Sequence, residues 1–273
     1  MQHSRNNTAL LERPLTARSV IASLLLGMHP PCMEGGRLVQ WCELFDIAPG
    51  TARVALSRMA ERGELSATDG VYELAGRVRS RQAAQDWSVA PDPAKWDGQW
   101  DLAVVTAEAR SAAERAALRD AMRRARYAEL REGVWARPDN LPRASAPEDA
   151  WAVIDAQCGW WHGRPDAGAR GERVLAEELF ATRAWAERAR VLLRRAGAVT
   201  RALQGGDHGR LADAFVVGAA TLQHVRNDPL LPTDLLPAAW PGGDLRRAYR
   251  DYQRAFAAAT AAWFRETNVG ARR

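Results

Sequence analysis

The segment from Pro49 to Leu74 constrains the fold of this 273-residue chain more than any other stretch. Its first half carries apolar residues at helical spacing, which predicts a short helix with one buried stripe. The stripe consists of Ala52, Ala55, Leu56 and Met59. Pro49 suits the first position of a helix, where its missing N–H costs nothing, and Gly63 suits the residue just past the end. We therefore expect a helix that begins at Pro49 and ends shortly before Gly63.

A tight β-hairpin is predicted directly after this helix. Two short runs with the composition of strands, Leu65–Thr68 and Val71–Leu74, flank the dipeptide Asp69-Gly70, which hairpin turns favour. A helix followed at once by a hairpin is typical of the DNA-binding half of a winged helix-turn-helix. A three-helix domain that serves protein contacts would give the same local pattern, so the pattern by itself leaves both interpretations open.

Two further helices are predicted upstream, at the spacing that a helix-turn-helix requires. Residues 15–28 form one apolar face, and Thr16 has the side chain of an N-cap. A second helix is expected over residues 36–45, and a short turn at Asp46–Ala48 leads into the helix at Pro49. This order of elements favours an N-terminal domain that binds duplex DNA.

The exposed face predicted for the Pro49 helix has the side chains that contacts with DNA require. Arg53 and Arg58 are each able to donate two hydrogen bonds to guanine, and the Val54 methyl groups suit the methyl group of thymine. Arg62 lies near the helix end, where a phosphate contact positions the protein without specifying sequence. The full set of expected DNA-contacting residues is Thr51, Arg53, Val54, Ser57, Arg58, Arg62, Asp69 and Gly70.

Composition agrees with a nucleic-acid partner. The formal net charge is +5 and the isoelectric point is about 9.6, which favours an acidic partner. The three cysteines form no CxxC pair and no metal-ligand spacing, which indicates a reducing compartment. No apolar run approaches the ~18–20 residues of a membrane span. We expect a cytoplasmic protein that uses no cofactor and no metal and does not associate with a membrane.

Two more domains are predicted in the rest of the chain. Because one combines strands with helices and the other is helical, the expected fold class is α+β. A linker with two prolines at 88–95 follows a basic helix at 75–87. The next elements are those of a ferredoxin-like sandwich, whose last strand is placed at 151–155. In order, they are a strand at 100–106, a helix at 109–125, a hairpin over 129–137, a short helix and that last strand. The adjacent run Trp160-Trp161-His162 is expected in a loop, where it would fill an interdomain seam.

The C-terminal part is predicted to be helical throughout. The expected helices cover 172–180, 182–196, 207–225, with an interruption at Gly218, and 244–265. Apolar residues of the last helix recur at alternating steps of four and three, which is typical either of core packing or of a dimer seam. The predicted domains are therefore a winged helix-turn-helix at 1–87, a ferredoxin-like domain at 96–165 and a helical domain at 171–273.

Five segments in this order resemble the PaaX-type repressors of phenylacetate catabolism. They are TARSVIASLLLG, RVALSRMAERGEL, WDGQWDLAVV, GVWARPDNL and DPLLPTDLLPAAWPG. The resemblance implies a homodimeric repressor on an inverted-repeat operator, which releases DNA when it binds an acyl-CoA thioester such as phenylacetyl-CoA. It also places Arg53, Ser57 and Arg58 at DNA-contacting positions of the helix and Asp69-Gly70 at the tip of the wing. The acidic Asp69 departs from a wing suited to phosphate.

An acyl-CoA effector needs cations for its phosphates and an apolar surface for its acyl group. We expect such a site between the middle and C-terminal domains. The residues expected there are Trp100, Trp135, Arg137, His224 and Arg226. The alternative is that these tryptophans belong to the core and the arginines to the surface.

Two other functions compete with an effector-responsive regulator. A ferredoxin-like domain also occurs in the metal-dependent nucleases of CRISPR adaptation, which place a catalytic aspartate at the end of the first strand. That position reads Val104-Val105-Thr106-Ala107 here, so we expect no enzyme activity. A non-sensing architectural nucleic-acid-binding protein is the other alternative, and the long chain beyond the N-terminal domain argues against it.

Overall fold

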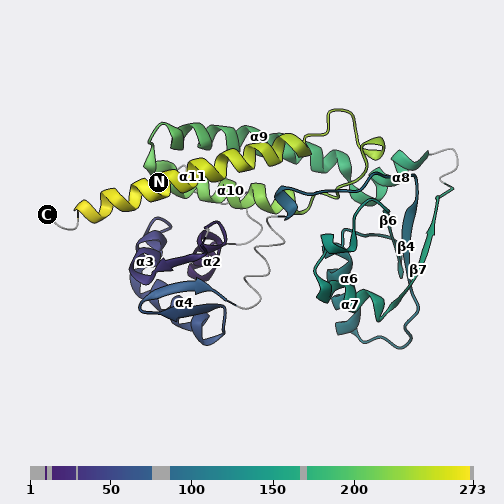
Figure 1. The fold of residues 1–273 in the computed structure, drawn as a ribbon, viewed down its shortest axis with the longest axis horizontal. Helices are drawn as coiled ribbons and strands as arrows, with labels where there is room; N and C mark the ends of the chain where they lie inside the picture. Colours follow the sequence, from purple (N-terminus) through teal and green to yellow (C-terminus); the bar gives the residue numbers. More distant parts are fainter. Residues whose placement is uncertain (1–9, 11–13, 29, 76–86, 167–170, 271–273) are drawn as a thin grey trace. The chain divides into compact units, whose positions relative to one another are not determined.

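The computed structural model describes residues 10, 14–28, 30–75, 87–166 and 171–270 and forms two compact units, whose elements are labelled in Figure 1. The helical unit comprises Met1–Val89, Ala189–Arg226 and Gly243–Arg273. The sheet unit comprises Ala90–Arg188 and Asn227–Gly242. Helices and small antiparallel sheets coexist, which confirms the expected α+β class. Of the basic helix predicted at 75–87, residues 76–86 lie outside the described part of the chain.

Among its described residues, the helical unit begins with three helices: α2 (Ala17–Leu26), α3 (Gly35–Glu43) and α4 (Pro49–Glu61). The predicted N-cap is confirmed, because Ser19 N donates to Thr16 Oγ1 at 3.2 Å and Thr16 N donates to Ser19 Oγ at 2.8 Å. The predicted ends of α4 are confirmed as well. Pro49 is its first residue, and Gly63 lies just beyond its end with a φ of +66°.

A three-stranded antiparallel sheet follows α4, in the order β1-β3-β2. The predicted hairpin is present as β2 (Leu65–Thr68) and β3 (Val71–Leu74). Asp69 and Gly70 have φ values of +50° and +79°, the left-handed conformations that a two-residue type I′ turn requires. Strand β1 (Cys32–Glu34) was not predicted, because its three residues are too few to show a period and become a strand by pairing with β3.

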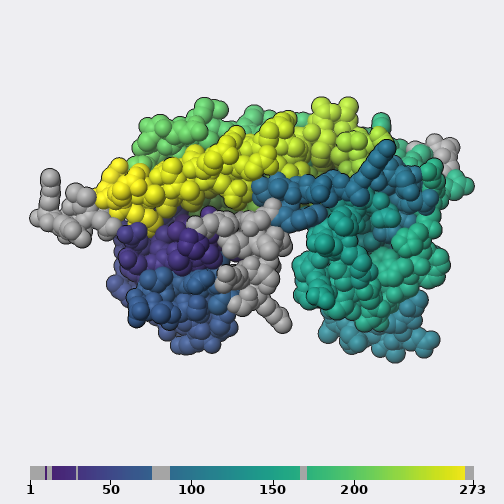
Figure 2. All heavy atoms as spheres, viewed as in Figure 1, coloured from purple at the N-terminus to yellow at the C-terminus, as the bar shows by residue number. Residues whose placement is uncertain are grey.

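Trp41 is the centre of the helical unit's aromatic core. Its side chain is fully buried. Its ring contacts one residue just beyond the end of α3 and residues of α10 (Leu211–Arg226) and α11 (Gly242–Gly270), at centroid distances of 5.8 to 6.2 Å. The contacting residues are Phe45, Phe215, Phe256, Trp263 and Phe264. Figure 2 shows the atoms of α11, in yellow, directly against those of the first helices, in purple. The N-terminal helices therefore share one core with the C-terminal helices.

The C-terminal helices begin with α8 (Gly171–Phe180) and α9 (Thr182–Gln204). The interruption predicted at Gly218 is wrong, because α10 is continuous through it. Gly218 instead makes room for α11: a Cβ at this position would lie 2.2 Å from Tyr252 Cζ. The apolar stripe of α11 packs within the chain, since Leu245, Tyr249 and Tyr252 are all buried. No described helix is both long enough and apolar enough to cross a membrane.

The sheet unit has the strand order of a ferredoxin-like sandwich, as predicted. Its antiparallel sheet runs β5-β6-β4-β7, with helices after the first and third of its strands in chain order. The strands are β4 (Trp100–Val105), β5 (Ala128–Arg131), β6 (Val134–Pro138) and β7 (Cys158–Gly163), and the helices are α6 (Ala112–Arg124) and α7 (Glu148–Asp155).

The last strand does not lie where the sequence placed it. Residues 151–155 belong to α7, so the strand predicted there is wrong, and β7 contains the Trp160-Trp161-His162 run that was expected in a loop. The run alternates as a strand does: the Trp160 ring packs against Tyr127 at 5.6 Å, whereas Trp161 is 52% exposed. A short apolar run has no period long enough to separate helix from strand, which explains the error.

Candidate functional site

Helix α4 presents a row of exposed side chains opposite its buried stripe. Ala52, Leu56 and Met59 are buried, as predicted, whereas Val54 on the outer face is 50% exposed. All eight residues predicted to contact DNA are exposed, on α4, at the residue that directly follows it or at the hairpin tip. These exposed residues are Thr51, Arg53, Val54, Ser57, Arg58, Arg62, Asp69 and Gly70.

The cations of this surface have no internal role in the described part of the chain. Within that part, Arg53, Arg58 and Arg62 have neither an ion pair nor a hydrogen bond from their guanidinium groups. Ser57 Oγ donates to Glu61 Oε1 at 3.2 Å, one turn further along α4. This surface is able to offer a partner charge-assisted hydrogen-bond donors from its three arginines and apolar contact from the Val54 methyl groups.

The hairpin contributes little positive charge to the same surface. Asp69 occupies its tip, and Glu73 lies on β3. Glu64, which precedes β2, pairs with Arg18 of α2, whose Nε lies 2.8 Å from Glu64 Oε2. Electrostatic attraction for an anionic partner is therefore concentrated on α4 rather than on the hairpin.

The residues predicted to bind an effector belong to different core clusters and to both units. Trp100 and Trp135 are both buried, but they belong to different clusters, Trp100 with Ala136 and Trp135 with Ala103. Arg137 lies with them in the sheet unit, whereas His224 and Arg226 end α10 in the helical unit. The two tryptophans therefore belong to the core, as the alternative to an effector site predicted.

Arg137 has a structural explanation of its own. Its side chain is only 2% exposed, and Nη2 donates to Asn140 Oδ1 at 2.8 Å while Nε donates to the Pro138 carbonyl at 3.0 Å. Nη1 lies 3.3 Å from the Arg126 carbonyl oxygen, and the Tyr127 ring centroid lies 5.8 Å from the guanidinium carbon. Burial lowers the pKa of Arg137 to about 10. Its hydrogen bonds hold the loop after β6 in place.

Replacing Arg137 by methionine should therefore lower the free energy of unfolding by about 2 kcal/mol, because Asn140 and the carbonyls lose their buried donor. Urea denaturation followed by circular dichroism measures this. The control is Arg123→Met, which changes an exposed arginine of α6 and should shift stability by less than ~0.5 kcal/mol. Unchanged stability of Arg137→Met would contradict the structural role and restore Arg137 as a ligand-binding residue.

The sheet unit contains a cluster of polar side chains that the sequence did not predict. The strand register places His162 of β7 opposite Asp101 of β4, and His162 Nδ1 lies 2.5 Å from Asp101 Oδ1. The Tyr127 hydroxyl donates to Asp101 Oδ2 at 3.0 Å. Burial raises the pKa of Asp139, whose carboxylate lies within 4.8 Å of the Asp101 and His162 ligand atoms. Assigning His162 to a loop concealed this cluster. The hydrogen bonds to Asp101 account for the placement of His162 and Tyr127.

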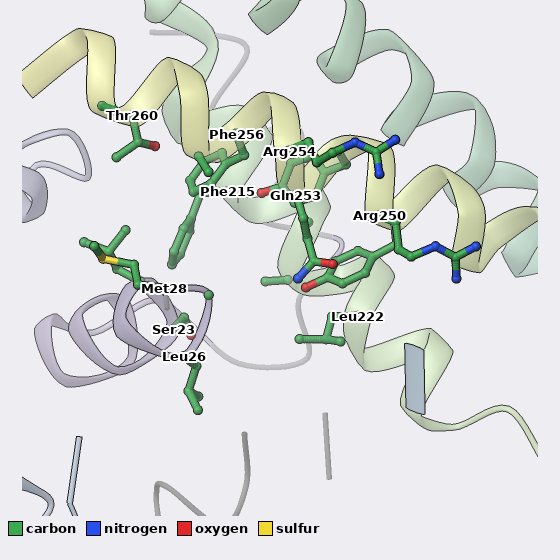
Figure 3. Close-up of a pocket in the computed structure, with 18 of the residues that line it drawn as sticks. Ser23, Leu26, Met28, Phe215, Leu222, Arg250, Gln253, Arg254, Phe256 and Thr260 are labelled. Carbon is green, nitrogen blue, oxygen red and sulfur yellow. The ribbon is translucent and has the colours of Figure 1, made fainter. Parts of the chain in front are cut away.

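A second feature that the sequence did not predict is a cavity of about 1090 Å³ in the helical unit. It lies between α2 and the helices α10 and α11, and Figure 3 shows Met28 across from Phe215 and Phe256. The structure describes all five residues that were predicted to bind an effector. Arg226 lines this cavity, and the other four do not. Its walls come from chain segments almost 200 residues apart, so no sequence motif marks it.

Three family models match successive parts of the chain. The model of "PaaX-like protein" matches residues 16–78, that of "PaaX protein central Cas2-like domain" matches 93–151, and that of "PaaX-like protein C-terminal domain" matches 180–266. Comparison with curated proteins gave no match. Among solved structures, the uncharacterized protein Rv0674 from Mycobacterium tuberculosis is 38% identical, with a TM-score of 0.71 over 91% of this chain and 99% of that one.

Proposed function

Because the chain belongs to the PaaX-like protein family, we propose that it is a sequence-specific DNA-binding transcriptional regulator of the PaaX type that acts as a repressor. The observation that carries this proposal is the outer face of α4, with its exposed arginines and Val54. Helices, turn and hairpin follow the order of a winged helix-turn-helix, in which such a helix enters the major groove.

Within this proposal, different residues of the α4 surface contact bases and phosphates. Arg53 and Arg58 donate paired hydrogen bonds to guanine, and the Val54 methyl groups contact thymine. Thr51, Ser57 and Arg62 contact phosphates or base edges at the margins of the helix. The Asp69-Gly70 tip lies beside the DNA backbone and adds little attraction, because it carries no cation.

The active form is a homodimer on an inverted-repeat operator, since a two-fold symmetric protein pairs naturally with a palindromic site. The effector is an acyl-CoA thioester such as phenylacetyl-CoA, which releases the repressor from its operator. Family membership supports both statements. Phosphates and an acyl group call for a site with cations beside an apolar surface.

A gel-shift experiment with the DNA upstream of the protein's own gene tests this function. We expect a discrete complex that a panel of acyl-CoA thioesters dissociates selectively, with one thioester effective at far lower concentration than free CoA. A complex that no thioester dissociates would contradict effector release. The absence of any complex with this DNA, under conditions in which the protein is folded, would contradict the regulatory proposal as a whole.

A further inference from the structure

The cavity between α2, α10 and α11 is lined by apolar side chains and by arginines. Its apolar part is lined by Leu24 of α2, Phe215 of α10, and Phe256 and Phe264 of α11. In Figure 3, Gln253 extends from α11 toward α2, and Leu222 of α10 lies across the same space. With a volume of about 1090 Å³, it is as large as the sites that proteins use for cofactor-sized ligands.

A buried hydroxyl group lines the cavity without a partner. Thr260 of α11 is only 7% exposed, and its Oγ1 makes no hydrogen bond within the described residues. Figure 3 shows Thr260 on the side of α11 that faces α2. Leaving a buried hydroxyl group unpaired costs free energy, whereas a ligand with an acceptor atom would satisfy it. This unpaired group points to a polar atom of a ligand at the inner wall.

The described residues that line the cavity carry charge of one sign only. The described lining residues include five arginines and neither an aspartate nor a glutamate. Two of the arginines are balanced by neighbours outside the lining, since Arg37 pairs with Glu34 and Arg254 pairs with Asp251. Within the described part of the chain, Arg250 donates only to the neutral Val89 carbonyl, at 3.3 Å, and Arg265 makes no ion pair or hydrogen bond.

From these observations we propose that the cavity binds an organic anion with an aromatic or aliphatic body, and that this is the site at which an effector controls DNA binding. The apolar body contacts the phenylalanines, Thr260 Oγ1 donates to a carbonyl or similar acceptor, and Arg250 and Arg265 hold the anionic groups at the rim. This assignment rests on the proposed function for its regulatory half, and on the cavity alone for its binding half.

The position of α2 provides the connection to DNA. Residues of α2 line the cavity, and α2 also packs against α4, the helix with the exposed arginines. A ligand that moves α2 relative to α10 and α11 therefore changes the placement of α4. Because coupling between two sites is reciprocal, the ligand lowers DNA affinity by the same factor by which DNA lowers ligand affinity.

Isothermal titration of the full chain, without DNA, tests the site. The probes are phenylacetyl-CoA and octanoyl-CoA, compared with free CoA and phenylacetate as their separated parts. The variant Arg250→Gln/Arg265→Gln should weaken thioester binding more than about tenfold, because it removes two charge-assisted donors. The control is Arg247→Gln, which removes one positive charge from the same helix at a residue outside the lining. It should change the affinity for the thioester less than about twofold.

A second pair of variants separates binding from folding. Thr260→Val and Thr200→Val each remove a buried unpaired hydroxyl group from the helical unit, so both should keep or raise the melting temperature. Only Thr260 lines the cavity, and Thr260→Val alone should weaken thioester binding, by about fivefold. Thr260→Val should need correspondingly more thioester to release DNA, whereas Thr200→Val should need the wild-type amount.

The possible results decide between the proposals. Failure of both thioesters to bind the wild-type chain, or equal effects of each variant and its control, overturns the site. Thioester binding that depends on Thr260 and Arg250 but leaves DNA affinity unchanged retains the binding site and overturns its regulatory role. Because titration needs no DNA, a failure of the proposed DNA-binding function would appear separately, as absence of the gel-shift complex.

Discussion

The double variant Arg53→Ala/Arg58→Ala should lose specific binding to the DNA upstream of the protein's own gene. Each paired arginine–guanine contact is worth about 1–3 kcal/mol, so losing both should weaken binding by roughly 30-fold to 25,000-fold. Both side chains are exposed and have no partner within the described chain, and the variant should therefore keep the wild-type melting temperature. Fluorescence anisotropy with a labelled duplex measures the affinity.

Two further variants show whether the loss is specific. Arg119→Ala removes an equally exposed arginine from α6 of the sheet unit and should leave affinity within about twofold of wild type. Arg62→Ala should weaken binding to all sequences alike and reduce the salt slope by about one, as loss of a phosphate contact does. If the double variant bound as tightly as Arg119→Ala, α4 would not be the recognition helix.

The second large effect is expected at Trp41. Replacing it by alanine should lower the free energy of unfolding by about 3–5 kcal/mol, because a fully buried indole is exchanged for a cavity. Its ring joins α3 to Phe215 of α10 and to Phe256 and Trp263 of α11, so the loss falls on the shared core of the helical unit.

Urea denaturation followed by far-ultraviolet circular dichroism measures the change. The matched control is Trp161→Ala, at a site on β7 that is 52% exposed, where the loss should stay below about 1 kcal/mol. Equal losses in the two variants would contradict a common core of N-terminal and C-terminal helices around Trp41. The control also shows how far loss of any tryptophan perturbs the circular dichroism signal itself.

Local chemistry predicted the N-terminal elements well. The N-cap at Thr16, Pro49 at the start of α4, Gly63 beyond its end and the Asp69-Gly70 turn all depend on neighbours within a few residues. Such interactions are present in the sequence pattern itself, and the exposed face of α4 followed from the same helical period.

Elements that depend on distant partners were missed or misplaced. Strand β1 exists because it pairs with β3, almost 40 residues later, and residues 151–155 are helical although their composition also suits a strand. Gly218 was expected to break α10, yet its role is to admit Tyr252 of α11. In each instance a tertiary contact decided a question that the local pattern left open.

The candidate sites differ in the same way. The α4 surface was predictable because exposure follows from the helix period, whereas Arg137 could not be recognised as a buried residue without the carbonyls that surround it. His162 gained its neighbour Asp101 only through strand pairing. The cavity next to α2 joins α10 and α11 to the N-terminal helices, and residue type alone gives no sign of such a site.

Competition between two duplexes shows directly whether the chain recognises a DNA sequence through α4. One carries the region upstream of the protein's own gene and the other the same bases in scrambled order, measured from about 50 to 200 mM salt. We expect the upstream duplex to bind at least about 10³-fold more tightly, with the preference retained across the salt range. Equal affinities that both fall steeply with salt would contradict it and identify an architectural nucleic-acid-binding protein.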